Sequence, residues 1–446
     1  MTTLVWFRDD LRLADNPALS VGRDDADGVV CLYVHDEESP GIRSLGAAAR
    51  WWLHHSLRSL AASLAEWGVP LVLRTGAADA VVREVVAEVG ADAVVWNRRY
   101  GGAERLLDAA LKKGLRDDGI DTRSFPAGML HEPWTIQTSG GTPFQVYSAF
   151  WRACLRMPEP RHPLPAPDTL TAAKRQLRSD DLDSWGLLPH DPDWASEFGQ
   201  RWTPGEKSAT AALTSFLAER VDDYADGRDM LALPATSGLS PHLRWGEISP
   251  HTIWHRARAA EGDVQGFLGE LGWREFAWYT LFHRPGLAEE NIDRRFDRFE
   301  WAEPEQELLD AWRKGRTGFP VVDAGMRELW RTGTMHNRAR MITASFLTKN
   351  LLLDWRIGES WFWDTLVDAD AANNPFNWQW VAGCGADAAP YFRVFNPLLQ
   401  QKKFDPHGTY VQRWAPESEG LDPIVDLKET RRRALAAFDA TKNGRP

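Results

Sequence analysis

The spacing of apolar residues changes once along this chain, and that change constrains the fold more than any single motif does. From Leu4 to about Phe125, short β-rich runs (LVWF, VVCLYV, LVLR, AVVW) alternate with amphipathic stretches such as 47–67 and 78–89. Alternating strands and helices are typical of a parallel sheet with crossover helices. The first part of the chain is therefore predicted to be a Rossmann-like α/β domain.

The rest of the chain has a different pattern. From Met157 to about Gly205, Pro, Asp and isolated Trp residues follow no sustained period, which is typical of a long linker. After Glu206 nearly every segment has helical spacing with caps and breakers between, including one predicted helix over 338–354. We therefore expect an α/β domain over residues 1–130, a linker over 131–204 and an all-helical domain over 205–446.

Charge and cysteine content exclude several classes of protein. The formal net charge of -11 argues against a basic coat, so a polyanionic partner has to meet a local patch. Three widely separated cysteines provide neither a disulfide framework nor the four thiolates of a typical iron–sulfur cluster. The N-terminal MTTLVWFRDD carries charges where a signal peptide is apolar, and no long apolar run follows. We expect a cytoplasmic protein without a membrane segment.

Two segments could hold phosphate or other anions. No GxGxxG follows the first strand, whose turn is RDDLRLADNPAL, so Arg8 and Arg12 there are either solvated or ligand-facing. TSGLSPHLRWGEISP over 236–250 places Ser and Thr before helices, which suits a phosphate site at a helix N-terminus. Two ordinary N-caps separated by a turn explain the same pattern.

Three further segments place polar groups beside aromatic rings. FLGELGWREFAWY puts Glu270, Trp273 and Arg274 within one helical turn, which is either a shared functional face or an exposed ion pair beside a core Trp. MHNRARM puts Asn337 and Met341 on one helix face. In DADAANN, two acids precede a helix break and can accept hydrogen bonds from sugar hydroxyls or ring nitrogens. No third ligand stands at metal spacing, so no metal site is expected.

The tryptophan content also requires an explanation. The chain holds 23 tryptophans, several of them between Met335 and Trp380 next to these polar motifs. Most are expected to pack in the core. Redox-active rings beside polar groups nevertheless favour a flavin held for electron transfer.

Together these segments resemble the photolyase/cryptochrome flavoproteins, and among them the bacterial cyclobutane pyrimidine dimer photolyases. The similar segments are VWFRDDLRLADNPAL, TSGLSPHLRWGEISP, ELGWREF, GFPVVDAGMRELWRTGTMHNRARMITASFL, DADAANN, WQWVAGCGADAAPYFRVFNP and KKFDP. The resemblance implies an α/β antenna domain, a long interdomain loop, and a helical domain that holds bent FAD beside a cavity for a flipped lesion.

The resemblance also implies the residues that bind FAD. Asn374 stands where the family places an amide opposite flavin N5, and an amide there favours repair. Phe267 replaces a Trp and Gly238 replaces an Arg common in relatives, and Thr334 replaces a Trp or Tyr; we expect these departures to modulate FAD binding. The implied cofactor residues are Tyr224, Thr236, Ser237, Gly238, Leu239, Ser240, Phe267, Arg274, Asn337, Arg340, Asp368, Asp370 and Asn374.

Other residues are implied to meet the lesion and the DNA. Glu270 resembles the acid that stabilises charge on the dimer, and Trp273 and Trp380 resemble the pocket walls that stack on extruded bases. Asn337 and Met341 complete the pocket floor, where enzymes that repair the (6-4) lesion have His. The expected DNA contacts are Glu270, Trp273, Trp380, Arg338, Arg340, Lys402 and Lys403, with an affinity that falls as salt rises.

The implied activity is light-driven DNA repair. Photoexcited FADH- donates an electron to a flipped-out cyclobutane pyrimidine dimer and splits it, while Trp378, Trp355 and Trp301 carry electrons between flavin and surface. The expected partner is UV-damaged DNA and the expected state is a monomer. NRRYGGAER retains Glu104 but lacks the preceding Asn of folate-binding relatives, so methenyltetrahydrofolate and 8-hydroxydeazaflavin both remain possible antennas. The alternatives are a cryptochrome-like blue-light photoreceptor and a flavoprotein with dark redox chemistry.

Overall fold

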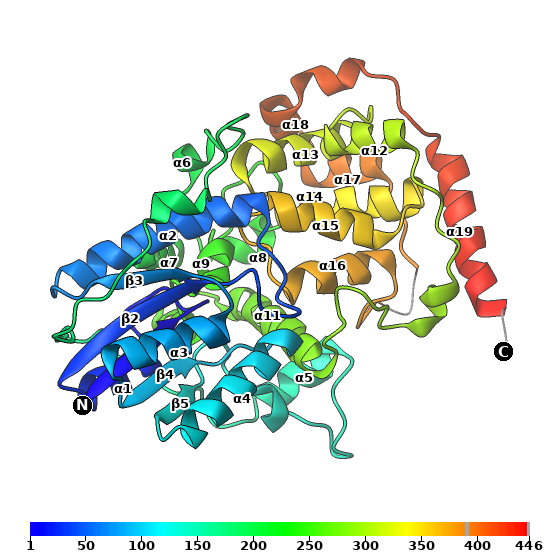
Figure 1. Cartoon of the computed structure of the whole chain (residues 1–446). Helices are drawn as coiled ribbons and strands as arrows, with labels where there is room; N and C mark the ends of the chain where they lie inside the picture. The colour runs from blue at the N-terminus through cyan, green and yellow to red at the C-terminus, as the bar shows by residue number, and fades with distance from the viewer. Residues whose placement is uncertain (389–391, 444–446) are drawn as a thin grey trace.

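The computed structural model describes residues 1–388 and 392–443, and it begins with an α/β domain (Figure 1). Five parallel strands form one sheet in the order β3-β2-β1-β4-β5. The strands are β1 (Thr2–Phe7), β2 (Gly28–His35), β3 (Leu71–Thr75), β4 (Ala93–Asn97) and β5 (Asp121–Phe125). The helices between them are α1 (Pro17–Asp24), α2 (Ala47–Ala65), α3 (Ala78–Val89) and α4 (Gly102–Asp117). The predicted Rossmann-like sheet is confirmed.

Both faces of the sheet are covered by helices, which explains the continuous apolar runs of the sequence. Because successive side chains point to opposite faces, Val5 and Phe7 pack with α1 and α2, while Leu4 and Trp6 pack with α3 and α4. Every residue of β2 is buried. A parallel sheet that is buried on both sides requires such strands.

The segment predicted as a linker is packed against both domains. Leu170 and Leu187 are buried in the core of the α/β domain, and Val29 forms an isolated bridge with Ala172. The segment also contains α5 (Tyr147–Cys154) and α6 (Phe198–Arg201). The apolar residues of this segment follow no regular spacing, yet they are buried by packing on strands and helices that lie far away in the sequence. The boundaries at residues 130 and 204 remain predictions.

The second half is helical, as predicted, and lies beside the sheet in Figure 1. Its helices are α7 (Glu206–Glu219), α8 (Tyr224–Gly227), α9 (Ser240–Arg244), α10 (Pro250–Ala259), α11 (Gln265–His283), α12 (Gln306–Arg313), α13 (Pro320–Thr332), α14 (Asn337–Ser345), α15 (Trp355–Thr365), α16 (Asn373–Ala382), α17 (Pro397–Phe404), α18 (Thr409–Trp414) and α19 (Leu427–Asn443). Within the described ranges, no helix has both the length and the apolar character needed to cross a membrane.

One predicted helix was wrong. The segment 338–354 is not a single helix, because α14 ends at Ser345 and a π-helical turn covers Phe346–Asn350. Leu352 then adopts a left-handed backbone with φ of 61°, which no helix can continue through. Asp354 starts the next helix by accepting a hydrogen bond from the Arg356 amide.

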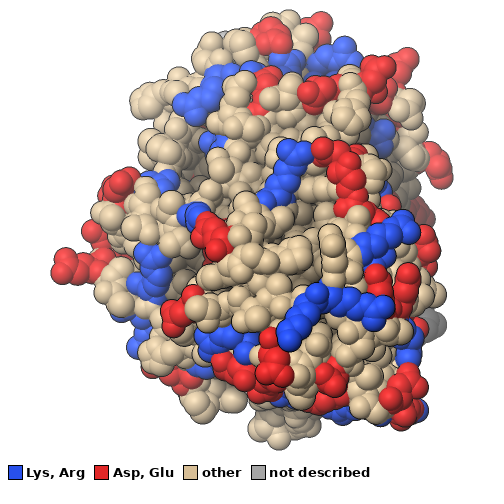
Figure 2. Space-filling view, turned by 60° about the vertical axis from the view of Figure 1, so that its left-hand side comes forward, with Lys and Arg blue, Asp and Glu red and all other residues tan. Residues whose placement is uncertain are grey.

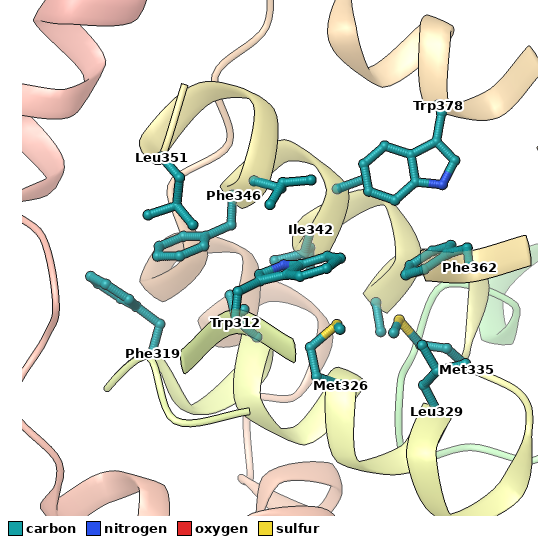
Figure 3. Close-up of a cluster of buried hydrophobic side chains, with 14 of the residues drawn as sticks. Trp312, Phe319, Met326, Leu329, Met335, Ile342, Phe346, Leu351, Phe362 and Trp378 are labelled. Atoms are coloured by element: carbon teal, nitrogen blue, oxygen red, sulfur yellow. The ribbon is translucent and has the colours of Figure 1, made fainter. Parts of the chain in front are cut away.

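Trp312 lies at the centre of the largest apolar cluster (Figure 3). Its side chain is fully buried, and its indole N–H donates to the Thr343 carbonyl at 3.1 Å. Around it lie Phe319, Met326, Leu329, Met335, Ile342, Phe346, Leu351, Phe362 and Trp378. Burying a large apolar side chain contributes roughly 1.5–3 kcal/mol, so this cluster holds α12 to α16 in fixed relative positions.

Close backbone contacts join the two domains at two glycines. Gly246 has φ of 63° and lies against the Asp9 backbone, where any side chain would collide. Gly46, before α2, lies equally close to the Trp363 carbonyl at the end of α15. The α/β domain therefore rests directly on the helices that surround the candidate site.

A buried carboxyl group also joins the domains. Glu275 on α11 is 1 % exposed, and its Oε2 accepts a hydrogen bond from the Leu130 amide at 2.9 Å. Burial raises the pKa of Glu275 from 4.5 to about 7. The folded protein therefore binds this proton more tightly than the unfolded chain does.

Replacing Glu275 with Gln tests this linkage. Because the raised pKa favours the protonated folded state, the contribution of Glu275 to the free energy of unfolding falls as the pH rises from 4.5 to about 7, and levels off above. The full contribution is about 3 kcal/mol. Urea unfolding of both proteins across this pH window should give a stability difference that shifts in favour of Glu275→Gln as the pH rises. A difference that does not vary with pH contradicts this assignment.

Candidate active site

Asp368 is the centre of the polar group that the sequence motifs predicted. Its Oδ2 accepts hydrogen bonds from the Ser240 hydroxyl at 2.6 Å and from the Arg340 guanidinium at 2.9 Å. Its Oδ1 is buried and has no hydrogen-bond partner among the described residues. A buried carboxylate oxygen without a donor costs free energy, so this atom fits a ligand that carries a hydroxyl or N–H group.

The segment that leads into α9 carries hydroxyl groups, one of which, that of Ser240, contacts Asp368. Thr236 and Ser240 are exposed, and Gly238 has φ of 70°. Leu239 stands at the N-cap of α9 without a side-chain oxygen, whereas Ser249 caps α10 by accepting a hydrogen bond from the Thr252 amide at 2.9 Å. Of the two predicted caps, only Ser249 is therefore an ordinary one.

Tyr224 and Phe267 belong to the same apolar cluster as Leu239 of this segment. Each packs against Phe216, with ring centroids 5.5 Å and 4.6 Å away, respectively. Burial raises the pKa of Tyr224 to about 12, so its hydroxyl stays neutral and able to donate. Phe267 is 7 % exposed and belongs to this apolar cluster.

Asp370 supports the site through the backbone. Its Oδ1 accepts hydrogen bonds from the Ala372 and Asn373 amides, and its Oδ2 accepts one from the Asn373 side chain. The carboxylate therefore fixes the start of α16. Asn374 follows directly, so Asp370 sets the position of its amide.

Asn374 is 8 % exposed and is held by α15. Its Nδ2 donates to the carbonyl oxygen and to the carboxylate Oε1 of Glu359, both at 2.9 Å. The sequence motifs did not single out Glu359, which lies fifteen residues earlier with no local signal that the two would meet.

Glu270 and Arg274 do not form the ion pair with each other that their spacing on α11 allows. Glu270 forms its ion pair with Arg228, at 2.6 Å, and Arg274 donates instead to the Gly128 carbonyl at 2.9 Å. Partners from other segments outcompete the neighbour one turn away on α11. Arg228 was missed because it stands outside every recognised motif.

Two tryptophans of the motifs, Trp273 on α11 and Trp380 on α16, are half-buried. Trp273 stacks on Tyr147 of α5, with ring centroids 3.8 Å apart and planes 11° from parallel. Trp380 on α16 has the Arg393 guanidinium 5.4 Å from its ring centroid. Tyr147 and Arg393 are further residues that the motifs did not indicate. Residues 389–391 of the GADAAPYF motif lie outside the described residues.

The MHNRARM segment forms the first turns of α14. Asn337 is exposed and Met341 is half-buried one turn later. Arg338 pairs with Asp229 at 2.5 Å, and Arg340 pairs with Asp368. Both arginines, predicted as DNA contacts, are thus already held by acids of this chain. Lys402 and Lys403 are exposed in the last turn of α17.

The three tryptophans predicted to carry electrons differ in burial. Trp378 is 2 % exposed, and its ring neighbours are Phe362 at 4.9 Å and Trp312 at 6.4 Å. Trp355 is fully buried and its indole N–H donates to Asn291 at 2.9 Å. Trp301 is half-buried and contacts Phe299 at 4.3 Å. The third indole is therefore the one that reaches solvent.

No metal centre accompanies these groups in the part of the chain that the structure describes, where no three His, Cys, Asp or Glu side chains gather. The site instead combines hydroxyls, an amide, a carboxylate with an open position, and indoles. This set suits a large organic cofactor with sugar hydroxyls and phosphates.

Comparison with known proteins identifies the family. A family model described as DNA photolyase matches residues 3–168, and one described as the FAD binding domain of DNA photolyase matches residues 267–423. The chain is 49% identical to the deoxyribodipyrimidine photo-lyase of Agrobacterium fabrum, over 98% of each chain. It is 38% identical to cryptochrome-1 of Arabidopsis thaliana, over 94% of this chain and 63% of that protein.

A solved structure agrees with these matches over the whole fold. The class III photolyase from Agrobacterium tumefaciens superposes with a TM-score of 0.94 at 47% identity, covering 99% of this chain and 98% of that one. The chain therefore belongs to the photolyase/cryptochrome family, and within it to the bacterial DNA photolyases that contain an FAD-binding domain.

Proposed function

We propose that this protein is a deoxyribodipyrimidine photo-lyase, which repairs cyclobutane pyrimidine dimers in UV-damaged DNA with FAD and light. The carrying observation is the 49% identity to a photolyase over 98% of both chains, against 38% identity to a plant cryptochrome. Repair is therefore favoured over signalling through a protein partner. A cytoplasmic, monomeric protein is part of the same proposal.

The open oxygen of Asp368 supports FAD as the ligand of the helical domain. Ser240 and Arg340 fix the orientation of that carboxylate. The hydroxyls of Thr236, Ser237 and Tyr224 offer donors to phosphate. Arg274 and Asn374 would meet the ring. When bound and reduced, FAD supplies on illumination the electron that begins to split the dimer.

The residues near Glu270 would receive the lesion. Trp273 and Trp380 offer flat faces on which extruded bases can stack, and stacking of Trp273 on Tyr147 fixes its ring before DNA arrives. Arg228 keeps Glu270 oriented, and the Glu270 side chain is still 35% exposed. Asn337 and Met341 would complete the floor of the pocket.

A second chromophore in the α/β domain belongs to the proposal, and methenyltetrahydrofolate and 8-hydroxydeazaflavin both remain candidates. Glu104 folds back over Gly101 at the start of α4, where a carboxylate is stabilised by the free amides of the helix.

Illuminated repair of a dimer-containing oligonucleotide tests the proposed function. The FAD-loaded protein should restore intact pyrimidines in blue light and not in the dark. Glu270→Gln should reduce the yield per absorbed photon severalfold, because a neutral amide stabilises charge on the dimer less well. Binding of FAD without any light-dependent repair would refute the proposed activity and favour a photoreceptor.

Replacing Trp355 with Phe separates electron supply from repair. Because its buried indole would be the middle carrier, the variant should lose light-driven reduction of oxidised FAD while keeping repair by chemically pre-reduced protein. Absorption spectra during illumination follow the first property, and the oligonucleotide assay follows the second. If both properties are lost together, Trp355 is mainly a packing residue.

The salt dependence of DNA binding tests the basic rim. Figure 2 shows Lys and Arg interspersed with Asp and Glu rather than a continuous basic coat, so a few cations should dominate binding. Replacing Lys402 and Lys403 with Gln should weaken binding and lower the slope of log affinity against log salt by about 1 to 2. An unchanged slope would exclude these lysines as phosphate contacts.

A further inference from the structure

The hydrogen bonds of Asn374 fix which way its amide points. Both partners of its Nδ2, the Glu359 carbonyl and the Glu359 carboxylate, can only accept hydrogen bonds. The nitrogen must therefore face Glu359. This leaves Oδ1, an acceptor, as the amide atom that Asn374 can offer to a ligand.

Glu359 is in turn held by a residue of the other domain. Arg43 donates from its two terminal nitrogens to the two carboxylate oxygens, at 2.7 Å and 2.9 Å. The Glu359 side chain is 4% exposed and the Arg43 side chain is 36% exposed. A bidentate arginine offsets the desolvation penalty of a buried carboxylate, which is large when the carboxylate has no cationic partner.

The loop that carries Arg43 is itself fixed on α15. The Trp363 indole donates to the Ser44 carbonyl, and the Ala47 amide donates to Asp364, both at 2.9 Å. The Arg43 guanidinium lies 3.9 Å from the Trp363 ring centroid. The docking of the α/β domain thus places the cation at Glu359.

We propose that Arg43 is a positioning residue for the flavin site, which acts from the α/β domain through Glu359 on Asn374. The inference rests on the proposed function, in which Asn374 faces FAD. By donating to both carboxylate oxygens of Glu359, Arg43 keeps this acceptor facing the Asn374 nitrogen, so the amide cannot flip. Oδ1 then stays directed to accept a hydrogen bond from the N–H that a reduced flavin ring carries at N5. Oxidised flavin has no such donor.

Four variants of the FAD-loaded full-length protein test this. Arg43→Gln removes the charge, Arg43→Lys retains it, and Asp364→Ala breaks the neighbouring contact between the same loop and α15 while leaving Glu359 and Asn374 untouched. Arg43→Gln is also made in an Asn374→Ala background. Each protein is reduced anaerobically with dithionite, and two properties are measured without DNA: the midpoint potential of the flavin and its dark reoxidation in air.

We expect both flavin properties to depend on the positive charge at position 43. In Arg43→Gln the midpoint potential should fall and reoxidation should become about tenfold faster, the factor that corresponds to the loss of one good hydrogen bond. Arg43→Lys should recover most of both properties. Asp364→Ala should match the unmodified protein, because the hydrogen bond from the Trp363 indole to the Ser44 carbonyl still holds the loop. In the Asn374→Ala background, Arg43→Gln should add no further change.

Other results overturn the inference. If the midpoint potential of Arg43→Gln equals that of the unmodified protein, Arg43 has no positioning role. If Asp364→Ala changes both properties as much as Arg43→Gln does, Arg43 acts only by docking the α/β domain on α15. An additional effect of Arg43→Gln in the Asn374→Ala background would mean that it does not act through the amide. Because no DNA is present, these outcomes are independent of repair: a protein that binds FAD but repairs no dimers refutes the proposed function and leaves this test valid.

Discussion

Burial of Trp312 among five helices is the constraint on which the candidate site depends. The cluster around it fixes α14, α15 and α16 against one another, and these helices carry Arg340, Glu359 and Asn374. Gly358 shows how closely they pack, because a methyl group there would collide with the Trp378 indole. Polar groups can hold defined positions at the edge of this cluster because the apolar packing, not the ligand, sets the distances between their helices.

The polar residues of the site fall into two functional groups. Asp370 and Glu359 have their hydrogen-bonding capacity taken up largely by the protein, so they shape the site, whereas Asp368 keeps one buried oxygen open. The hydrogen bonds of the protein alone therefore distinguish carboxylates that hold other site residues in place from the one that can bind a ligand. It also explains why Arg338 and Arg340 contribute little to a basic surface although they lie in a basic motif: each is paired with an acid.

The domain junction links the two halves of the protein physically. Gly46 and Gly246 allow backbone contact, and the loop before α2 then reaches α15 with Arg43. This ion pair connects the α/β domain to the residues that hold Asn374 in the candidate site. The first domain thus fixes the orientation of a buried carboxylate in the second, and that carboxylate holds the Asn374 amide.

The sequence by itself determined the fold class, most helix positions and the residue types of the site, because apolar period, capping residues and the family motifs are local signals. It predicted the parallel sheet, and it placed Asp368 and Asn374 in one functional segment. It could not show that Glu270 pairs with Arg228, that Trp273 stacks on Tyr147, or that Arg43 reaches Glu359. Those partners stand far apart in the chain, and only the packing of helices on the sheet decides which side chains meet.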